Sequence, residues 1–211
     1  MKTDVLMVGV GGQGVVLASD ALAEIAMKNG YDVKKSDTLG MAQRGGSVSS
    51  HVRLGEHIFS PIMSKGDADF LLAFELLEGA RSADYLRQGG VAIINDQAIP
   101  PLSVVGDASA YPSTSEVERI IRRYTDEVYF LPGREIAEEM GNAQVLNVLL
   151  LGFLSRFLAM DEQAYIGDLS QRVPARFLEL NLRAFSRGRE EAESRRLAKP
   201  IGMRERRRSK R

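Results

Sequence analysis

The sequence predicts an α/β protein built on a Rossmann-like, mostly parallel sheet, with an inserted antiparallel hairpin, helices on both faces and a C-terminal helical segment. Two patterns favour this class. Short apolar runs typical of buried parallel strands alternate with apolar residues at helical spacing, and a glycine-rich turn joins the first such pair. A third pattern, the alternation of apolar and polar residues over 48–54, adds the hairpin. The chain has 211 residues, of which 44% are hydrophobic, which is enough for one domain with a substantial core.

The N-terminal part predicts a strand, a glycine turn, a helix and a second strand. Residues 5–8 form a short apolar run, and apolar residues at helical spacing follow the glycines until Asn29 and Gly30, which favour a helix stop. Residues 31–34 then resemble a second strand. The first 35 residues therefore predict a βαβ unit.

The next part predicts a loop and then the hairpin. Residues 36–47 show weak periodicity and contain a glycine pair, so we expect a loop there. Residues 48–54 alternate as a half-buried strand does, and Gly55 and Glu56 suit a two-residue turn. Residues 57–62 are then expected to return antiparallel to that strand.

The remaining chain predicts a return to alternating strands and helices. Strands are expected at residues 70–74, 91–95 and 128–131. Helices are expected at residues 76–86, 116–124, 135–140 and 145–160. Pro174 suits the first turn of a last helix, in which Phe177, Asn181 and Phe185 share one stripe.

The charge of the chain is unevenly distributed. Lys and Arg together number 28, as do Asp and Glu, but residues 187–211 hold 11 basic and 4 acidic residues, which leaves 17 basic and 24 acidic residues in the body. We therefore expect a domain over 1–188 and a basic tail over 189–211, of which residues 190–197 prolong the last helix and the end is mobile unless a partner holds it.

The composition excludes several classes of function. Without cysteine, the chain forms no disulfide, offers no thiolate nucleophile and cannot ligate an iron–sulfur cluster through cysteine. Two histidines, His51 and His57, leave little for a metal site, and we expect none. The balanced charge and the lack of aromatic residues after Phe185 argue against nucleic-acid binding. No secretory signal or membrane-length apolar run is recognisable, so we expect a soluble, cytoplasmic protein.

The first candidate site is the glycine turn after the first strand. Gly9, Gly11, Gly12, Gln13 and Gly14 fit G-x-G-x-x-G between a predicted strand and a predicted helix. Glycines allow a tight turn and close approach of the backbone to a ligand, while the helix start offers N–H groups and partial positive charge to a phosphate or carboxylate. The alternative is a tight turn that binds nothing.

The second candidate site is the loop that contains Arg44, Gly45, Gly46 and Ser47. An arginine beside glycines can present its guanidinium and backbone N–H groups to one anion. In a doubly wound sheet this loop would lie at the carboxyl edge near the glycine turn, where such folds bind ligands. The alternative is an ordinary glycine turn with a solvated arginine.

Two asparagines near the long apolar helix are further candidates. Asn142 is most simply a helix cap, and Asn147, on an apolar face, requires a hydrogen-bond partner and is expected to face a ligand or another chain if buried. Dinucleotide binding is less well supported. The acidic residue that grips the ribose in such folds is matched only imperfectly by Asp32, which lies inside the predicted strand, or by Asp37, slightly past it.

Taken in order and spacing, three segments resemble the gamma-type domain of the 2-oxoacid:ferredoxin oxidoreductases. They are the glycine turn, residues 42–53, which read Ala-Gln-Arg-Gly-Gly-Ser-Val-Ser-Ser-His-Val-Arg, and residues 141–152. The resemblance covers residues 4–187 and leaves out the basic tail. A free-standing chain of this length is most similar to the small subunit of the type that acts on aryl pyruvates such as indolepyruvate.

The resemblance implies an enzyme complex that oxidatively decarboxylates a 2-oxo acid with coenzyme A to acyl-CoA, CO2 and reduced ferredoxin. It implies that a larger alpha subunit carries thiamine diphosphate and [4Fe-4S] clusters and that ferredoxin docks there, so that this chain alone holds no cofactor. It also implies that this chain closes over the active site, with Arg44 in a catalytic role and the glycine loops binding an anion of coenzyme A or the substrate. Two alternatives remain open: an independent NAD(P)- or flavin-binding oxidoreductase, and a non-catalytic scaffold subunit.

Overall fold

The structure is a computed structural model, which describes residues 2–40, 46–100 and 111–198. Its centre is a six-stranded sheet with the strand order β2-β3-β1-β4-β5-β6. The strands are β1 (Thr3–Val10), β2 (Asp32–Leu39), β3 (Ser47–Gly55), β4 (Ala68–Ala73), β5 (Leu86–Asn95) and β6 (Glu127–Leu131).

The sheet is parallel on one side of β1 and antiparallel on the other. β1, β4, β5 and β6 pair in parallel, whereas β3 pairs antiparallel with both β1 and β2. The mostly parallel sheet with an inserted antiparallel hairpin is thus confirmed. In a parallel sheet the strands end at one shared edge, and here that carboxyl edge gathers the segments after β1, β4 and β5.

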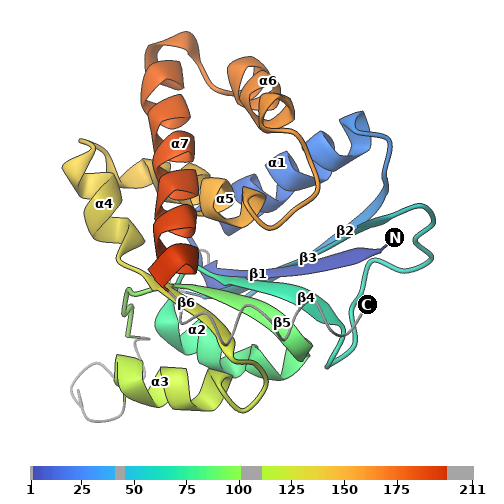
Figure 1. Ribbon diagram of the computed structural model, residues 1–211, viewed down its shortest axis with the longest axis vertical. Helices are drawn as coiled ribbons and strands as arrows, with labels where there is room; N and C mark the ends of the chain where they lie inside the picture. Colours follow the sequence, from blue (N-terminus) through green and yellow to red (C-terminus); the bar gives the residue numbers. More distant parts are fainter. Residues whose placement is uncertain (1, 41–45, 101–110, 199–211) are drawn as a thin grey trace.

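Helices cover both faces of this sheet (Figure 1). One face carries α1 (Val15–Lys28), α5 (Leu146–Ser155), α6 (Glu162–Arg172) and α7 (Ala175–Ala198), with α4 (Gly133–Glu139) beside them. The other face carries α2 (Leu76–Arg81) and α3 (Thr114–Ile121). β1 contributes to a hydrophobic core on each face of the sheet, because its side chains alternate between the two faces. Val5 and Met7 pack with α1 and α5, whereas Leu6 and Val8 pack with α2 and α3.

The hairpin lies elsewhere than the sequence pattern suggests. The expected strand at 48–54 is present as β3, but its partner is β2, which extends to Leu39 and so includes residues expected in a loop. Residues 57–62 form no strand. The backbone of this segment forms hydrogen bonds with side chains of β2 and β3 instead. Asp32 accepts from Ile58 N at 2.8 Å, and Arg53 donates to Ile62 O at 2.6 Å. The expected return strand is therefore wrong.

Two of the expected helices end five residues earlier than the sequence predicts. The helix expected at 76–86 ends at Arg81, a 3₁₀ turn η1 (Ala83–Tyr85) follows, and the glycines at 89 and 90 lie within β5 rather than at a helix end. The helix expected at 145–160 ends at Ser155, and α6 is an additional helix. Asp161 starts it, because its carboxylate accepts from Gln163 N at 2.9 Å as an N-cap.

The last helix packs closely across α5. A Cβ atom added at Gly152 would collide with the carbonyl of Phe185, and one added at Gly188 would collide with the carbonyl of Leu149. Only glycine permits this approach of two helix backbones. α7 continues through residues 190–197 as expected, passes residue 188 without a break, and buries Ala192 completely.

Within the described ranges, no helix combines the length and the apolar character that a membrane crossing requires.

Candidate functional site

The glycine turn stands at the carboxyl end of β1 and opens α1, as the sequence predicts. Gly12 and Gly14 have φ angles of 100° and 83°, in the left-handed region that favours glycine. Gly14 is the N-cap residue of α1, so the first N–H groups of the helix follow it directly. Gly9 lies in β1 beneath the turn and is buried.

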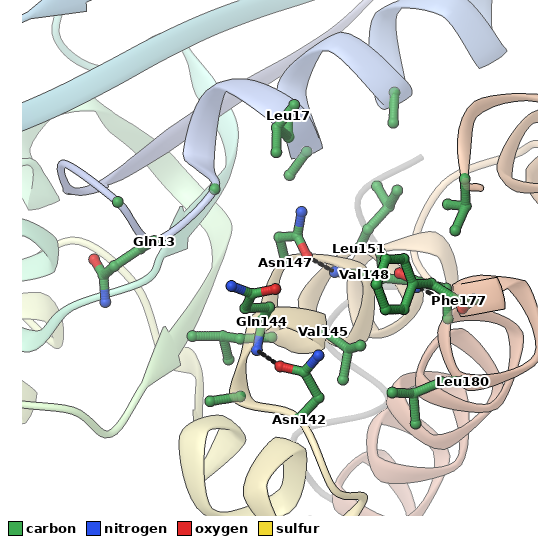
Figure 2. Close-up of a pocket in the computed structure, with 18 of the residues that line it drawn as sticks. Gln13, Leu17, Asn142, Gln144, Val145, Asn147, Val148, Leu151, Phe177 and Leu180 are labelled. Atoms are coloured by element: carbon green, nitrogen blue, oxygen red, sulfur yellow. Dashed lines mark hydrogen bonds between the residues drawn. The ribbon is translucent and has the colours of Figure 1, made fainter.

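The side chain of Gln13 holds this turn in place through three hydrogen bonds. Its Oε1 accepts from Val10 N at 2.8 Å, and its Nε2 donates to Phe74 O at 2.8 Å and to Gln97 Oε1 at 3.2 Å. A Cβ atom at Gly9 would come within 2.8 Å of the same Oε1. The side chain therefore ties β1 to the end of β4, and Figure 2 shows it pointing away from the side chain of Asn147.

A second buried amide, Asn95, extends this network. Its Nδ2 donates to Phe74 O at 2.9 Å and to Gln97 Oε1 at 3.2 Å, and its Oδ1 accepts from Arg134 N at 3.3 Å, at the start of α4. Asn95 was not singled out from the sequence. The available signal was an amide that directly follows an apolar strand, at the edge where α/β sheets bind ligands.

The second loop meets the glycine turn through its last glycine. Gly11 N donates to Gly46 O at 2.9 Å. Ser47 points to the other face, where its Oγ donates to Glu78 Oε2 at 2.5 Å. Arg44 and Gly45 lie outside the described residues. The structure therefore brings the end of this loop to the turn, while the proposed role of Arg44 remains a prediction.

The first turn of α2 is held by the buried carboxylate of Glu75, which was not singled out from the sequence. Glu75 accepts from Glu78 N at 2.8 Å and from Ile99 N at 3.1 Å, and it also receives the hydroxyl of Tyr111. Burial and this hydrogen bond raise the pKa of Tyr111, so the phenol stays a neutral donor. Glu75 thus fixes both ends of the segment between β5 and α3.

A pocket of about 710 Å³ opens beside the glycine turn. Six of the predicted site residues line it: Gly11, Gly12, Gln13, Gly14, Asn142 and Asn147. Gly9, Gly46 and Ser47 are not part of this lining. The rest of the wall comes from α1, α4, α5, α6, α7, the 3₁₀ turn η4 (Ala143–Val145) and connecting segments, including the one that follows β5.

Both asparagines line this pocket, and their proposed contact with a ligand stays a prediction. Asn142 caps η4, because its Oδ1 accepts from Gln144 N at 2.9 Å. Asn147 is half-buried, its Oδ1 accepts from Val148 N at 2.9 Å, and its side chain lies 3.1 Å from where a Cβ atom of Gly14 would stand. Figure 2 shows the two amides on the same side of the pocket as Gln144.

The charges around the pocket are largely neutralised. Arg134 pairs with Glu138, and Arg172 pairs with Asp168 and Glu24. No carboxylate belongs to the described lining. A ligand in this pocket would therefore meet neutral amide groups and apolar side chains, with paired arginines at two places on the wall.

The histidines do not form a common site. His51 is buried in β3, where its Nδ1 accepts from Met63 N at 3.2 Å and its ring meets Tyr85 edge-on at 5.6 Å. Burial lowers its pKa, with a smaller contribution from Arg53. His57 lies beyond the end of β3. Across the parts of the chain that the structure describes, no group of three or more His, Cys, Asp or Glu residues could hold a metal ion.

The sheet order weakens the dinucleotide interpretation. β3 lies between β1 and β2, so the strand that carries Asp37 is not the neighbour of the glycine turn. Asp37 instead accepts from Ser50 Oγ at 2.7 Å and pairs with Lys35. Its carboxylate is therefore engaged within the hairpin.

Comparison with known proteins gives a consistent family. The family model for pyruvate ferredoxin/flavodoxin oxidoreductase matches residues 4–191. The chain is 33% identical over 188 residues to indolepyruvate oxidoreductase subunit IorB of Thermococcus kodakarensis, which covers 88% of this chain and 93% of that protein. It is 35% identical over 198 residues to the subunit of the same name from Archaeoglobus fulgidus, which covers 91% of this chain and 96% of the relative.

Solved structures share the fold. The gamma subunit of a keto/oxoacid ferredoxin oxidoreductase from Geobacter sulfurreducens superimposes with a TM-score of 0.68 at 24% identity, covering 91% of this chain and 99% of the other. A 2-oxoglutarate:ferredoxin oxidoreductase from Magnetococcus marinus gives a TM-score of 0.71 at 20% identity, covering 92% of this chain but 31% of that longer chain. The resemblance read from the glycine turn and residues 42–53 is confirmed, and the chain belongs to the pyruvate ferredoxin/flavodoxin oxidoreductase family.

Proposed function

We propose that this chain is the small subunit of a cytoplasmic 2-oxoacid:ferredoxin oxidoreductase that acts on an aryl pyruvate of the indolepyruvate type. With coenzyme A, the complex would produce acyl-CoA, CO2 and reduced ferredoxin. The identity to IorB proteins over most of both chains supports the substrate class. The observation that carries the proposal is the bond from Gly11 N to Gly46 O, which joins the two glycine-containing segments beside a 710 Å³ pocket.

The cofactors belong to a larger partner subunit in this proposal. Iron–sulfur clusters are held by cysteine thiolates, and the full sequence contains no cysteine. The chain's own residues therefore do not fit a [4Fe-4S] cluster. When bound to the partner, thiamine diphosphate supplies the decarboxylation chemistry. This chain would close over that active site, exclude water and bind part of an anionic substrate.

The anion-binding role divides between backbone and side chains. The N–H groups that open α1 after Gly14 carry the partial positive charge of a 14-residue helix. Arg44 would add a full charge, and Asn142 and Asn147 would add amide contacts. Gly11 N donates to Gly46 O and Gln13 N donates to Val10 O, so the binding role falls on the amides that open α1.

The test is the reconstituted complex. The chain is co-purified with its larger thiamine-dependent partner, and indolepyruvate- and coenzyme A-dependent reduction of ferredoxin is measured. We expect Arg44→Ala to lower kcat/KM at least about tenfold, which corresponds to about 1.4 kcal/mol. Arg119→Ala, an exposed arginine on α3, is the matched control and should leave turnover unchanged.

Three outcomes would reject parts of the proposal. Full activity of the large subunit without this chain would reject a catalytic contribution. Unchanged kinetics of Arg44→Ala would favour the scaffold alternative. Calorimetric binding of NADH, NADPH or FAD to the isolated chain would favour an independent oxidoreductase.

A further inference from the structure

The pocket beside the glycine turn continues well beyond the residues that the proposed anion site uses. It extends between α1 and α5 toward the start of α7, where Leu151, Phe177 and Leu180 form its wall. Its volume of about 710 Å³ falls within the ~300–1,000 Å³ range of small-molecule sites. The space is therefore large enough for a ligand group in addition to an anion at the turn.

One wall of this extension is apolar and incompletely covered. Leu17 on α1 is 60% exposed and Phe177 on α7 is 40% exposed, although both line the pocket. Large apolar side chains left accessible inside a concave space favour an apolar or aromatic ligand, because its binding removes their surface from water. The Arg176 guanidinium lies over one face of the Phe177 ring, 4.6 Å from its centroid, so a planar ligand would stack on the other face.

The facing wall is polar but neutral. Asn142, Gln144 and Asn147 gather there (Figure 2). The side-chain oxygens of Asn142 and Asn147 are taken by Gln144 N and Val148 N, which leaves their NH2 groups as the donors turned to other partners. Neutral amide donors opposite an apolar wall match an aromatic group that carries hydrogen-bond acceptors, either on the edge of the ring or on a carboxylate or carbonyl beside it. They do not match a metal ion, which needs oxygen or nitrogen ligands with lone pairs.

We propose that this part of the pocket binds a planar heteroaromatic or acyl-substituted aromatic ring, with its face against Phe177 and Leu17 and its polar edge toward the carboxamides. The choice of ligand rests on the proposed function, which offers two sources for such a ring. One is the aryl group of the 2-oxo acid, and the other is the adenine ring of coenzyme A. The shared chemistry is a flat ring with hydrogen-bond acceptors at one end, which are ring nitrogens in adenine and the oxygens of the oxo acid group in the aryl substrate.

The chain itself makes the experiment simple, because it contains no tryptophan. Indole-3-acetate, excited beyond the absorption of tyrosine, therefore reports its own binding through fluorescence anisotropy. The full-length chain and the co-purified complex are titrated with this probe, and separately with adenosine monophosphate by calorimetry. We expect Phe177→Ala to weaken binding about tenfold, as expected when an aromatic wall is lost.

Two further variants distinguish a loss of ligand contacts from a general effect on folding. Phe59→Ala removes a phenylalanine that is 98% exposed and far along the chain from the pocket lining, and it should leave binding unchanged. Leu17→Ala gives a second variant of the apolar wall, should Phe177→Ala disturb the helix as judged by circular dichroism. Sensitivity of indole-3-acetate binding to both wall variants identifies the aryl source, and sensitivity of adenosine monophosphate binding identifies the adenine source.

The proposal is overturned if neither probe binds at millimolar concentration, or if binding is the same in the wild type, Phe177→Ala and Leu17→Ala. Its failure is distinct from that of the proposed function. A complex that turns over indolepyruvate without ring binding to this chain rejects only the ring site. Ring binding in a complex without 2-oxo acid turnover rejects only the proposed function.

Discussion

The backbone N–H of Gly11 donates to the carbonyl of Gly46 across 2.9 Å. This bond joins the turn after β1 to the segment that enters β3, two antiparallel neighbours in the sheet. The bond therefore fixes the turn and this segment against each other at the edge of the sheet. The side chains that support this unit become the most informative positions for mutation.

Gln13→Leu should destabilise the chain by about 1–3 kcal/mol, because it leaves Val10 N without its side-chain acceptor and Phe74 O with Asn95 as its remaining side-chain donor. Urea denaturation measures the free energy of unfolding. Gln144→Leu is the matched control, since this glutamine is exposed at the pocket, and its effect should stay within about 0.5 kcal/mol. Equal effects of the two substitutions would contradict a supporting role for Gln13.

Gly14→Ala should destabilise the chain by about 1–2 kcal/mol through its left-handed backbone alone. It should also displace Asn147, which lies 3.1 Å from the new Cβ atom. Gly167→Ala is the opposite case, because this helical glycine has no neighbour within 4 Å of an added Cβ and no positive φ. We expect it to stabilise α6 by up to about 1 kcal/mol. Thermal unfolding of both variants measures the change in stability. A Gly14→Ala variant as stable as the wild type would show that the turn relaxes without cost.

The sequence predicted the elements that depend on local pattern. The strand before the glycine turn, the helix after it and the parallel order of the later strands follow from apolar periodicity, which burial in a two-faced sheet imposes on each residue. The capping role of Asn142 was likewise predictable, since its side chain bonds only two residues ahead.

The parts that were missed depend on contacts distant in sequence. Residues 57–62 were expected to return as a strand after a two-residue turn at Gly55 and Glu56. In the structure Asp32 and Arg53 bond to their backbone groups, and neither contact can be predicted from residue spacing. Gln13 was expected to contact a ligand, yet its partner Phe74 is 61 residues away. Buried polar networks of this kind require the tertiary fold before their partners can be named.

Arg53→Met should destabilise the chain by about 3 kcal/mol, because it leaves the buried carboxylate of Asp4 without its main partner. The guanidinium contacts both Asp4 oxygens, at 3.0 and 3.1 Å, and also holds the loop through Ile62 O. Lys2 pairs with the same carboxylate from a half-exposed position, so Lys2→Ala is the control and should cost less than about 1 kcal/mol. Chemical denaturation of the two variants would contradict this account if Lys2→Ala proved the more damaging.

The buried His51 should make stability depend on pH. Burial disfavours the imidazolium, with a smaller contribution from the charge of Arg53, so the pKa of His51 in the folded chain lies below its usual value of 6.5. Above that value the histidine is neutral in both states and its contribution to stability is complete. As the pH falls below it, the unfolded chain takes up the proton first, so the free energy of unfolding decreases by at most about 1.4 kcal/mol per pH unit until the folded pKa is passed.

His51→Gln should remove this decrease from urea-denaturation curves recorded between neutral and mildly acid pH, whereas His57→Gln, at an exposed position, should retain it. Identical pH profiles for the wild type and His51→Gln would show that other groups govern the acid stability.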